Sequence, residues 1–303
     1  MVERAEARAN RVGKVLLADK DMSVTGYELS GSISKETAVD PVSDIDVVIY
    51  LDPYGWRSTR GVLYAPSTVL KVIEDRLSHT YTVHIRRGDV RIRRQTHSVG
   101  VIYSGAQSLD IDVVPAIWDD GSGDRLVRIP ERGTGDWILT SVYRQKQALD
   151  RLDAPGRPLR RGIRALKVWR NNLEVDIHSY GLETIVMVLV AENVVRRSVE
   201  SIVLGTLEWL AEIPDVRAIG CMLFDHRDDE PGRYAACAFD PAVPGNNVLS
   251  YLTHAECKRI ATRARKTLRQ LTDAKECLAE GDLSAALEVV EEAFGLETGL
   301  SIS

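Results

Sequence analysis

The sequence predicts an α+β protein with a sheet lobe followed by a helical lobe, on three observations. Apolar segments between residues 22 and 115 are short and often alternate with polar residues, as in strands. Beyond about residue 136 the apolar residues recur every three to four positions, as in helices. A chain of 303 residues is long enough for two modest domains. We therefore expect a sheet domain over residues 1–130 and a helical domain over residues 131–303.

The N-terminal stretch to about Leu17 has the pattern of a helix. In the first half the other expected elements are strands over residues 22–29, 45–51, 80–85, 98–103 and 109–114, and a helix over 66–77. The second half predicts helices over 137–149, 159–172, 181–194, 199–211, 247–271 and 283–294. Residues 225–247 are rich in Gly, Pro, Asn and Asp, which indicates a loop.

Charge and composition exclude several classes of protein. The 39 Lys and Arg against 44 Asp and Glu give a formal net charge of -5, which argues against a nucleic-acid-coating protein. No apolar run approaches the ~20 residues of a membrane span, and the N-terminus has no apolar signal core, so we expect a cytoplasmic chain without a membrane partner. The four cysteines are too scattered for a zinc-binding pair.

A Gly-Ser pair followed by two alternating aspartates is the first candidate site. Asp44 and Asp46 enter an apolar strand, so both carboxylates lie on one face. Like charges on one face are costly unless a cation such as Mg²⁺, which prefers oxygen ligands, binds between them. Gly31 lets the backbone approach a phosphate and Ser32 offers it a hydroxyl. For an isolated Asp-x-Asp, a simple turn is the more common alternative.

A second strand, residues 109–117, repeats the pattern with Asp110 and Asp112. If it lies beside the first, one of its carboxylates completes a triad around two cations about 3.5 to 4 Å apart, as in nucleotidyl transfer. The basic segment 84–94 carries five Arg and one Asp. It reads best as a solvated edge strand, and the alternative is a track for acceptor or RNA phosphates.

Motifs in both halves resemble one enzyme superfamily. Gly31-Ser32, Asp44-x-Asp46 and Asp112-Val-Val-Pro115 resemble the active-site pattern of the DNA polymerase β-like nucleotidyltransferases. The closest likeness is to the cGAS/DncV-like nucleotidyltransferases, the bacterial relatives of cyclic GMP-AMP synthase and oligoadenylate synthetase. The supporting motifs of the second half are Lys167-Val-Trp169, Ser179-Tyr180-Gly-Leu-Glu183, Asp240-Pro241 with Asn246-Asn247-Val248, and Phe294-Gly295.

The resemblance implies a bilobed fold with a central active-site cleft, and a role for each matching residue. Asp44, Asp46 and Asp112 would hold two Mg²⁺ ions, or Mn²⁺ as an alternative, with Asp110 as the runner-up third ligand. Gly31 and Ser32 would bind the donor phosphates. In the helical lobe, Lys167 would contact the triphosphate, Ser179 would hydrogen-bond it or cap its helix, and Tyr180 would stack on a base.

Arg160 and Arg164 lie at helical spacing from Lys167, which predicts a basic stripe on one side of a helix. The alternative for the two arginines is a solvated helix face. Gly181 departs from the bulkier polar residue that the family more often has, so the edge that contacts the base is expected to differ. Nothing corresponds to the zinc insertion of the animal DNA sensor.

The function that the resemblance implies is synthesis of a cyclic di- or trinucleotide messenger from nucleoside triphosphates in bacterial antiphage (CBASS-type) signalling. A regulatory protein or RNA activator, and a downstream effector bound through the product, would be its partners. The alternative is an RNA terminal nucleotidyltransferase of the CCA- or poly(A)-adding type, which shares the catalytic strands. A nucleotide-binding pseudoenzyme is the non-enzymatic rival, disfavoured by the cost of three clustered acids without metals.

Overall fold

The computed structural model describes residues 2–40, 42, 44–84, 90–103, 109–119, 125–213, 234–243 and 245–296. The chain divides into two compact units, residues 1–146 and 147–303. The first unit thus extends beyond residue 130 and includes one further strand, Trp137–Thr140, and the first part of a helix. The mixed sheet followed by helices confirms the α+β expectation. None of the helices in these ranges is both long and apolar enough to cross a membrane.

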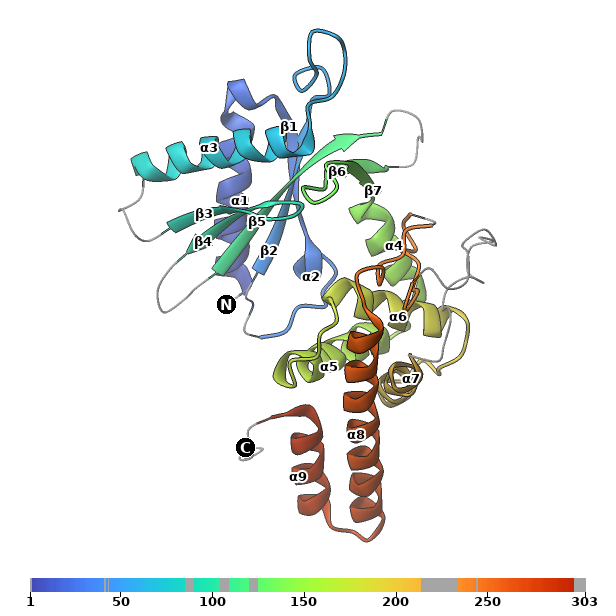
Figure 1. Cartoon of the computed structure of the whole chain (residues 1–303). Coiled ribbons are helices and arrows are strands. Elements are labelled where there is room, and N and C mark those ends of the chain that lie inside the picture. Colours follow the sequence, from blue (N-terminus) through green and yellow to red (C-terminus); the bar gives the residue numbers. More distant parts are fainter. Residues whose placement is uncertain are drawn as a thin grey trace. The chain divides into compact units, whose positions relative to one another are not determined.

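The first unit is built on one mixed sheet (Figure 1). Its strands pair in the order β1-β2-β5-β4-β3, and β6 and β7 extend it from β5. Only the central pair, β2 and β5, is parallel among the described strands. The strands are β1 (Val24–Ser30), β2 (Asp44–Leu51), β3 (Val90–Arg94), β4 (Val99–Tyr103), β5 (Leu109–Trp118), β6 (Val127–Pro130) and β7 (Trp137–Thr140).

Two helices, α1 (Val2–Ala18) and α3 (Pro66–His84), cover one face of this sheet. Alternation along β2 sends Ile45, Val47, Ile49 and Leu51 into the core beneath these helices. The intervening positions therefore point to the other face of the sheet. The remaining short helices of the unit are α2 (Gly31–Ser34) and the 3-10 turn η1 (Lys20–Met22).

Two sequence predictions for this unit are wrong. Residues 80–84 form the last turn of α3, because Tyr81 packs into the core and carries the helix through a β-favouring stretch. Trp137–Thr140 is strand β7, paired with β6, and the helix expected from 137 begins only at Val142. The edge strand expected in the basic segment is confirmed as β3, whereas residues 85–89 lie outside the described residues.

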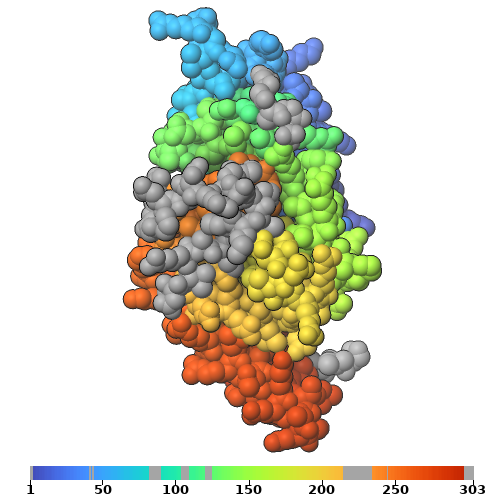
Figure 2. All heavy atoms as spheres, turned by 90° about the vertical axis from the view of Figure 1, so that its right-hand side faces the viewer, coloured from blue at the N-terminus to red at the C-terminus, as the bar shows by residue number. Residues whose placement is uncertain are grey.

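The second unit is helical, with its core between helices (Figure 1). Residues 181–190 of the central helix are all buried, as expected of a helix apolar on every side. The space-filling view shows α7 (yellow) against α8 (orange) (Figure 2). The helices are α4 (Val142–Leu152), which crosses the unit boundary, α5 (Pro158–Asn172), α6 (Ser179–Ala191), α7 (Val199–Glu212), α8 (His254–Ala279) and α9 (Leu283–Phe294).

The longest of these helices, α8, begins later and ends later than the sequence predicted. Thr253 caps its N-terminus in a reciprocal capping box with Glu256, which fixes the start. Buried Trp169 ties α5 to α8 through an Nε1 hydrogen bond of 2.9 Å to the Thr267 hydroxyl. The described cysteines, Cys237, Cys257 and Cys277, are free thiols, and Cys221 lies outside the described residues.

Candidate active site

The parallel pairing of β2 and β5 aligns four aspartates on one face of the sheet. Asp44 is the partner of Asp110, and Asp46 is the partner of Asp112. The residues between them, such as Ile45 and Ile111, are buried on the opposite face, so all four carboxylates share the face away from α1 and α3. The sequence prediction that the two acidic strands lie side by side is therefore confirmed.

Asp112 has a strongly raised pKa. Burial and the negative charges of Asp46, Asp44 and Asp110 raise its pKa to about 7, against a lowering by a hydrogen bond from Gln95. A carboxyl group with this pKa is protonated in part near neutral pH. The carboxylates on the metal-free face therefore repel one another, and a bound cation would offset their negative charge.

Gly31 lies directly against this acidic face. The preceding residue, Ser30, ends β1 and pairs with Asp46. The backbone of Gly31 has a φ of +68°, and a Cβ atom there would lie 2.0 Å from Asp46 Oδ2. Only glycine fits such a position. Ser32 follows in α2, where its carbonyl accepts a hydrogen bond from the Thr37 amide.

The residues on this face fit a divalent cation of the Mg²⁺ type. The donors are carboxylate oxygens, which hard cations prefer, and the like charges that raise the Asp112 pKa are the charges that a cation would neutralise. Within the described ranges, no three His, Cys, Asp or Glu side chains converge closely enough to form a preformed metal site. Substrate phosphates would then supply part of the coordination, as is usual for Mg²⁺.

Lys167, Ser179 and Tyr180 lie in the second unit, on α5 and α6. Lys167 is 3% exposed, and its Nζ donates a hydrogen bond of 2.5 Å to Glu183 Oε1 on α6. Both charges are buried, so the ion pair is stable only if its geometry is good, because burying either charge without the other would cost free energy. Glu183, a member of the Ser-Tyr-Gly-Leu-Glu motif, is therefore a residue that holds the Lys167 ammonium.

The basic stripe expected around Lys167 is not a surface stripe. Arg160 is 4% exposed and forms ion pairs with Asp150 and Asp153, so its charge is neutralised inside the unit. Only Arg164 of the three is exposed. Helical spacing placed the three cations on one side of α5, but it gave no sign of the acidic partners that bury two of them.

Ser179 is the first residue of α6, and the N-cap position belongs to His178. The prediction that Ser179 caps the helix is therefore wrong. Its hydroxyl accepts a hydrogen bond of 2.5 Å from Arg170 Nη1, which also approaches the Ile177 carbonyl. Next to it, His178 stacks on Tyr251 at a centroid distance of 3.9 Å, and burial lowers the pKa of this histidine.

Tyr180 is anchored by a buried carboxylate. Its hydroxyl donates a hydrogen bond of 2.5 Å to Asp240 Oδ1, and Asp240 is fully buried. Burial is the main cause that raises the pKa of both groups, so the phenol stays protonated as the donor. The contact fixes the plane of the Tyr180 ring. Gly181 next to it faces Leu249, because a Cβ there would lie 2.7 Å from Leu249 Cδ2, so this glycine serves packing and does not shape an open edge.

The Asp-Pro and Asn-Asn segments hold each other in place. Asp240 also accepts a hydrogen bond from the Ala242 amide. Asn247 is 6% exposed, and its side chain accepts hydrogen bonds from the amides of Ala238 and Leu249 and donates one to the Ala236 carbonyl. These motif residues therefore stabilise the loop that carries the anchor of Tyr180.

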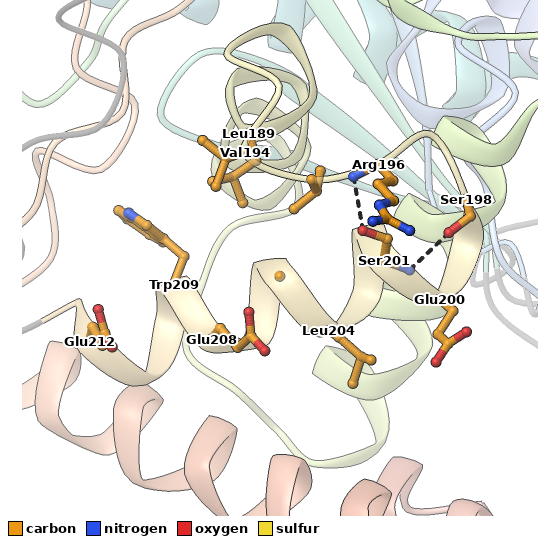
Figure 3. Close-up of a pocket in the computed structure, with 12 residues that line it drawn as sticks. Leu189, Val194, Arg196, Ser198, Glu200, Ser201, Leu204, Glu208, Trp209 and Glu212 are labelled. Atoms are coloured by element: carbon orange, nitrogen blue, oxygen red, sulfur yellow. Dashed lines mark hydrogen bonds between the residues drawn. The ribbon is translucent and has the colours of Figure 1, made fainter. Parts of the chain in front are cut away.

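A cavity of about 600 Å³ lies along α7, and none of the predicted site residues lines it (Figure 3). Arg196 N donates a hydrogen bond to the Ser201 hydroxyl at its rim, and Ser198 caps α7. Trp209 is 9% exposed and its Nε1 has no hydrogen-bond partner in the described part of the chain. We assign this cavity no function.

Comparison with known proteins identifies the family of this chain. The family model described as the Second Messenger Oligonucleotide or Dinucleotide Synthetase domain matches residues 2–152. The CBASS oligonucleotide cyclase CdnC of Escherichia coli (strain KTE188) is 26% identical over 292 residues, which cover 93% of this chain and 86% of that protein.

Solved structures share the fold over nearly the whole chain. CdnC of E. coli MS115-1 with ATP has a TM-score of 0.73 at 22% identity, covering 97% of this chain and 91% of that one. The CdnC:HORMA-deltaN complex of the same strain gives a TM-score of 0.68 at 23% identity, covering 97% and 90%. The resemblance read from the motifs is confirmed. This chain belongs to the Second Messenger Oligonucleotide or Dinucleotide Synthetase family, the bacterial cyclic oligonucleotide synthases of the polymerase β-like nucleotidyltransferases.

Proposed function

We propose that Asp44, Asp46 and Asp112 hold two Mg²⁺ ions, with Mn²⁺ as an alternative, on which this chain condenses nucleoside triphosphates. The chain is a nucleotidyltransferase, a CBASS oligonucleotide cyclase that makes cyclic di- or trinucleotide messengers in antiphage defence. The observation that carries the metal proposal is the register of β2 and β5, which pairs Asp46 with Asp112.

The reaction requires a ribose hydroxyl to attack an α-phosphate and pyrophosphate to leave. Bound Mg²⁺ would supply acidification of that hydroxyl and neutralisation of the leaving group. Gly31 leaves the backbone beside Asp46 open, which allows phosphate oxygens to approach it, and Ser32 offers them a hydroxyl. Asp112, which pairs with Asp46 across the two central strands, would hold the metals or accept the proton of the attacking hydroxyl.

Residues of the second unit would bind the rest of the nucleotide. The anchored ring of Tyr180 supports its proposed role as a stacking surface, since a ring held in one plane loses little freedom when a base binds. Ser179 and Arg170 form a hydroxyl–guanidinium pair suited to a phosphate. Lys167 is held by Glu183, so its proposed contact with the triphosphate requires the ammonium to exchange or share this partner.

We also propose that a regulatory protein controls the enzyme. The CdnC of E. coli MS115-1 forms a complex with a HORMA protein, and this chain shares its fold over nearly its full length. The cyclic product would bind a separate effector. The substrates, nucleoside triphosphates, are cytoplasmic metabolites, which supports a cytoplasmic site of action.

The test is product analysis with metal-site variants. Purified protein is incubated with all four nucleoside triphosphates and Mg²⁺ or Mn²⁺, and phosphatase-resistant products are identified by mass spectrometry. We expect a cyclic product from the wild-type protein, none from Asp44→Asn/Asp46→Asn, and product from Asp110→Asn, which removes a neighbouring acid that is not a proposed ligand. An active double variant would refute the metal assignment.

The RNA terminal transferase alternative predicts a different product. It would extend added RNA into a linear chain, and it would need a basic face for that acceptor. The family match favours cyclic synthesis. Linear extension of tRNA without a cyclic product would reverse this conclusion.

A further inference from the structure

We propose that Gln95, in the turn between β3 and β4, is a positioning residue that holds the carboxylate of Asp112 in place for metal binding. The turn comprises residues 95–98, and no local pattern in these residues indicates a contact with the acidic strands. This inference rests on the proposed metal role of Asp112. It concerns what orients that ligand and adds no new ligand.

The contact between the two side chains has a defined polarity. Gln95 Nε2 donates a hydrogen bond of 2.8 Å to Asp112 Oδ1. An ionised carboxylate only accepts hydrogen bonds, so the amide must present its nitrogen to Asp112 and its oxygen elsewhere. That oxygen, Oε1, accepts a hydrogen bond of 2.9 Å from the hydroxyl of Ser98. Ser98 thus fixes the orientation of the amide, and the amide fixes one oxygen of Asp112.

The turn that carries Gln95 is itself tied down at several points. The Gln95 amide donates a hydrogen bond of 2.8 Å to the Ser98 carbonyl, and Ser98 is 5% exposed. The Thr96 carbonyl accepts a hydrogen bond of 2.9 Å from the Arg132 amide. His97 Nδ1 lies 3.0 Å from the Pro130 carbonyl. These bonds anchor the turn to the end of β6, so it is a rigid support for a side chain.

Gly100 gives the amide the space that it occupies. It is the β4 partner of Asp112. A Cβ on Gly100 would lie 2.9 Å from Gln95 Nε2 and 3.2 Å from Asp112 Oδ1. The hydrogen bond therefore passes over a position where any larger residue would displace it. Strand pairing, the glycine and the tethered turn together leave Oδ2 of Asp112 unused by Gln95.

A carboxylate held by one oxygen presents the other to a cation with little loss of rotational freedom. Partners that orient metal ligands in this way typically change metal affinity or activity by about 10 to 100-fold when they are removed. We expect an effect of this size from Gln95, expressed in metal affinity and in kcat at limiting metal. We expect little change in KM for the nucleotide at saturating metal, since Gln95 is not proposed to contact the substrate.

The test uses the full chain with Mn²⁺ alone as the probe. Gln95→Met keeps the length of the side chain without the amide, and Ser98→Ala keeps the Asp112 contact but releases the amide. Gln145→Met is the matched control, because Gln145 is a half-buried glutamine of the same unit that hydrogen-bonds Thr140. Mn²⁺ affinity is measured by electron paramagnetic resonance without nucleotide, and unfolding in EDTA is followed separately.

We expect Gln95→Met to weaken Mn²⁺ binding by about 10 to 100-fold. Ser98→Ala should weaken it by a smaller factor, and Gln145→Met should leave it unchanged. Excess Mn²⁺ should restore most of the kcat of Gln95→Met. Wild-type Mn²⁺ affinity in both Gln95→Met and Ser98→Ala would overturn the inference. If Gln95→Met fails to fold, Ser98→Ala decides alone. Failure of the proposed function looks different, because Asp112→Asn would then bind Mn²⁺ and make product as the wild type does.

Discussion

Replacing Asp112 by Asn should stabilise the metal-free protein while it destroys the proposed metal site. Burial and the three neighbouring aspartates raise the pKa of Asp112 from its ordinary 3.8 to about 7. The folded state therefore holds a proton that the unfolded state releases, and the free energy of unfolding falls as the pH rises from about 4 to about 7. Above pH 7 Asp112 is ionised in both states, so its destabilisation of the folded state is at its maximum and no longer changes with pH.

The rise of the Asp112 pKa to about 7 limits the loss in free energy of unfolding to about 4 kcal/mol, at about 1.4 kcal/mol for each tenfold change in proton affinity. The side chain is only half-buried, and solvent screening reduces the cost, so we expect a gain of about 1–3 kcal/mol from Asp112→Asn above pH 7. The gain should shrink toward zero near pH 4. The amide of Asn still offers an oxygen to Gln95, so that hydrogen bond is kept.

The assay is urea denaturation in EDTA between pH 4.5 and 8.5. A second series contains Mg²⁺, which should stabilise the wild-type protein but not Asp112→Asn. The control is Asp75→Asn, which removes an exposed, lysine-paired carboxylate on α3 and should change stability by less than about 0.5 kcal/mol. A loss of stability in Asp112→Asn at pH 8, or a gain that does not depend on pH, would refute the electrostatic reasoning.

Three further substitutions test other parts of the site. Gly31→Ala should abolish synthesis and cost about 1–3 kcal/mol, because its Cβ would collide with Asp46 and its φ is positive; an active, stable variant in a product assay would contradict this. Tyr180→Phe should cost about 1–3 kcal/mol in urea denaturation by leaving Asp240 short of a donor, and should raise KM for the nucleotide, because the ring loses the hydrogen bond that holds it for stacking. Glu183→Ala should cost about 3–5 kcal/mol, because it removes the carboxylate that forms an ion pair with the buried Lys167 ammonium; wild-type stability would show that other acceptors replace this carboxylate.

The acidic strands were predictable because alternation is a local property. Asp44, Asp46, Asp110 and Asp112 each precede an apolar neighbour, and period two alone puts the two aspartates of each strand on one face. Gln95 was not predictable, because it reaches Asp112 only through the antiparallel pairing of β4 with β5. Nothing in its local sequence signals that contact.

Charge patterns on helices did not indicate which charges are exposed, because exposure also depends on residues distant in the sequence. The spacing of Arg160 and Lys167 indicates a shared side of α5, but whether that side faces solvent depends on acids elsewhere in the chain. Asp153 and Glu183 supply those acids and bury both cations. The error over residues 80–84 was of a related kind, since core packing of Tyr81 outweighed the local strand preference.

The electrostatic cost of the Asp46–Asp112 pairing also bears on how such proteins change over evolutionary time. Any substitution that removes one of these carboxylates would relieve repulsion, while the apolar face of β2 and β5 would still hold the sheet together. Drift under selection for foldability alone would thus erase the acids and leave the scaffold intact. Their presence in this chain is a sign of selection for chemistry, acting against the thermodynamic preference of the fold.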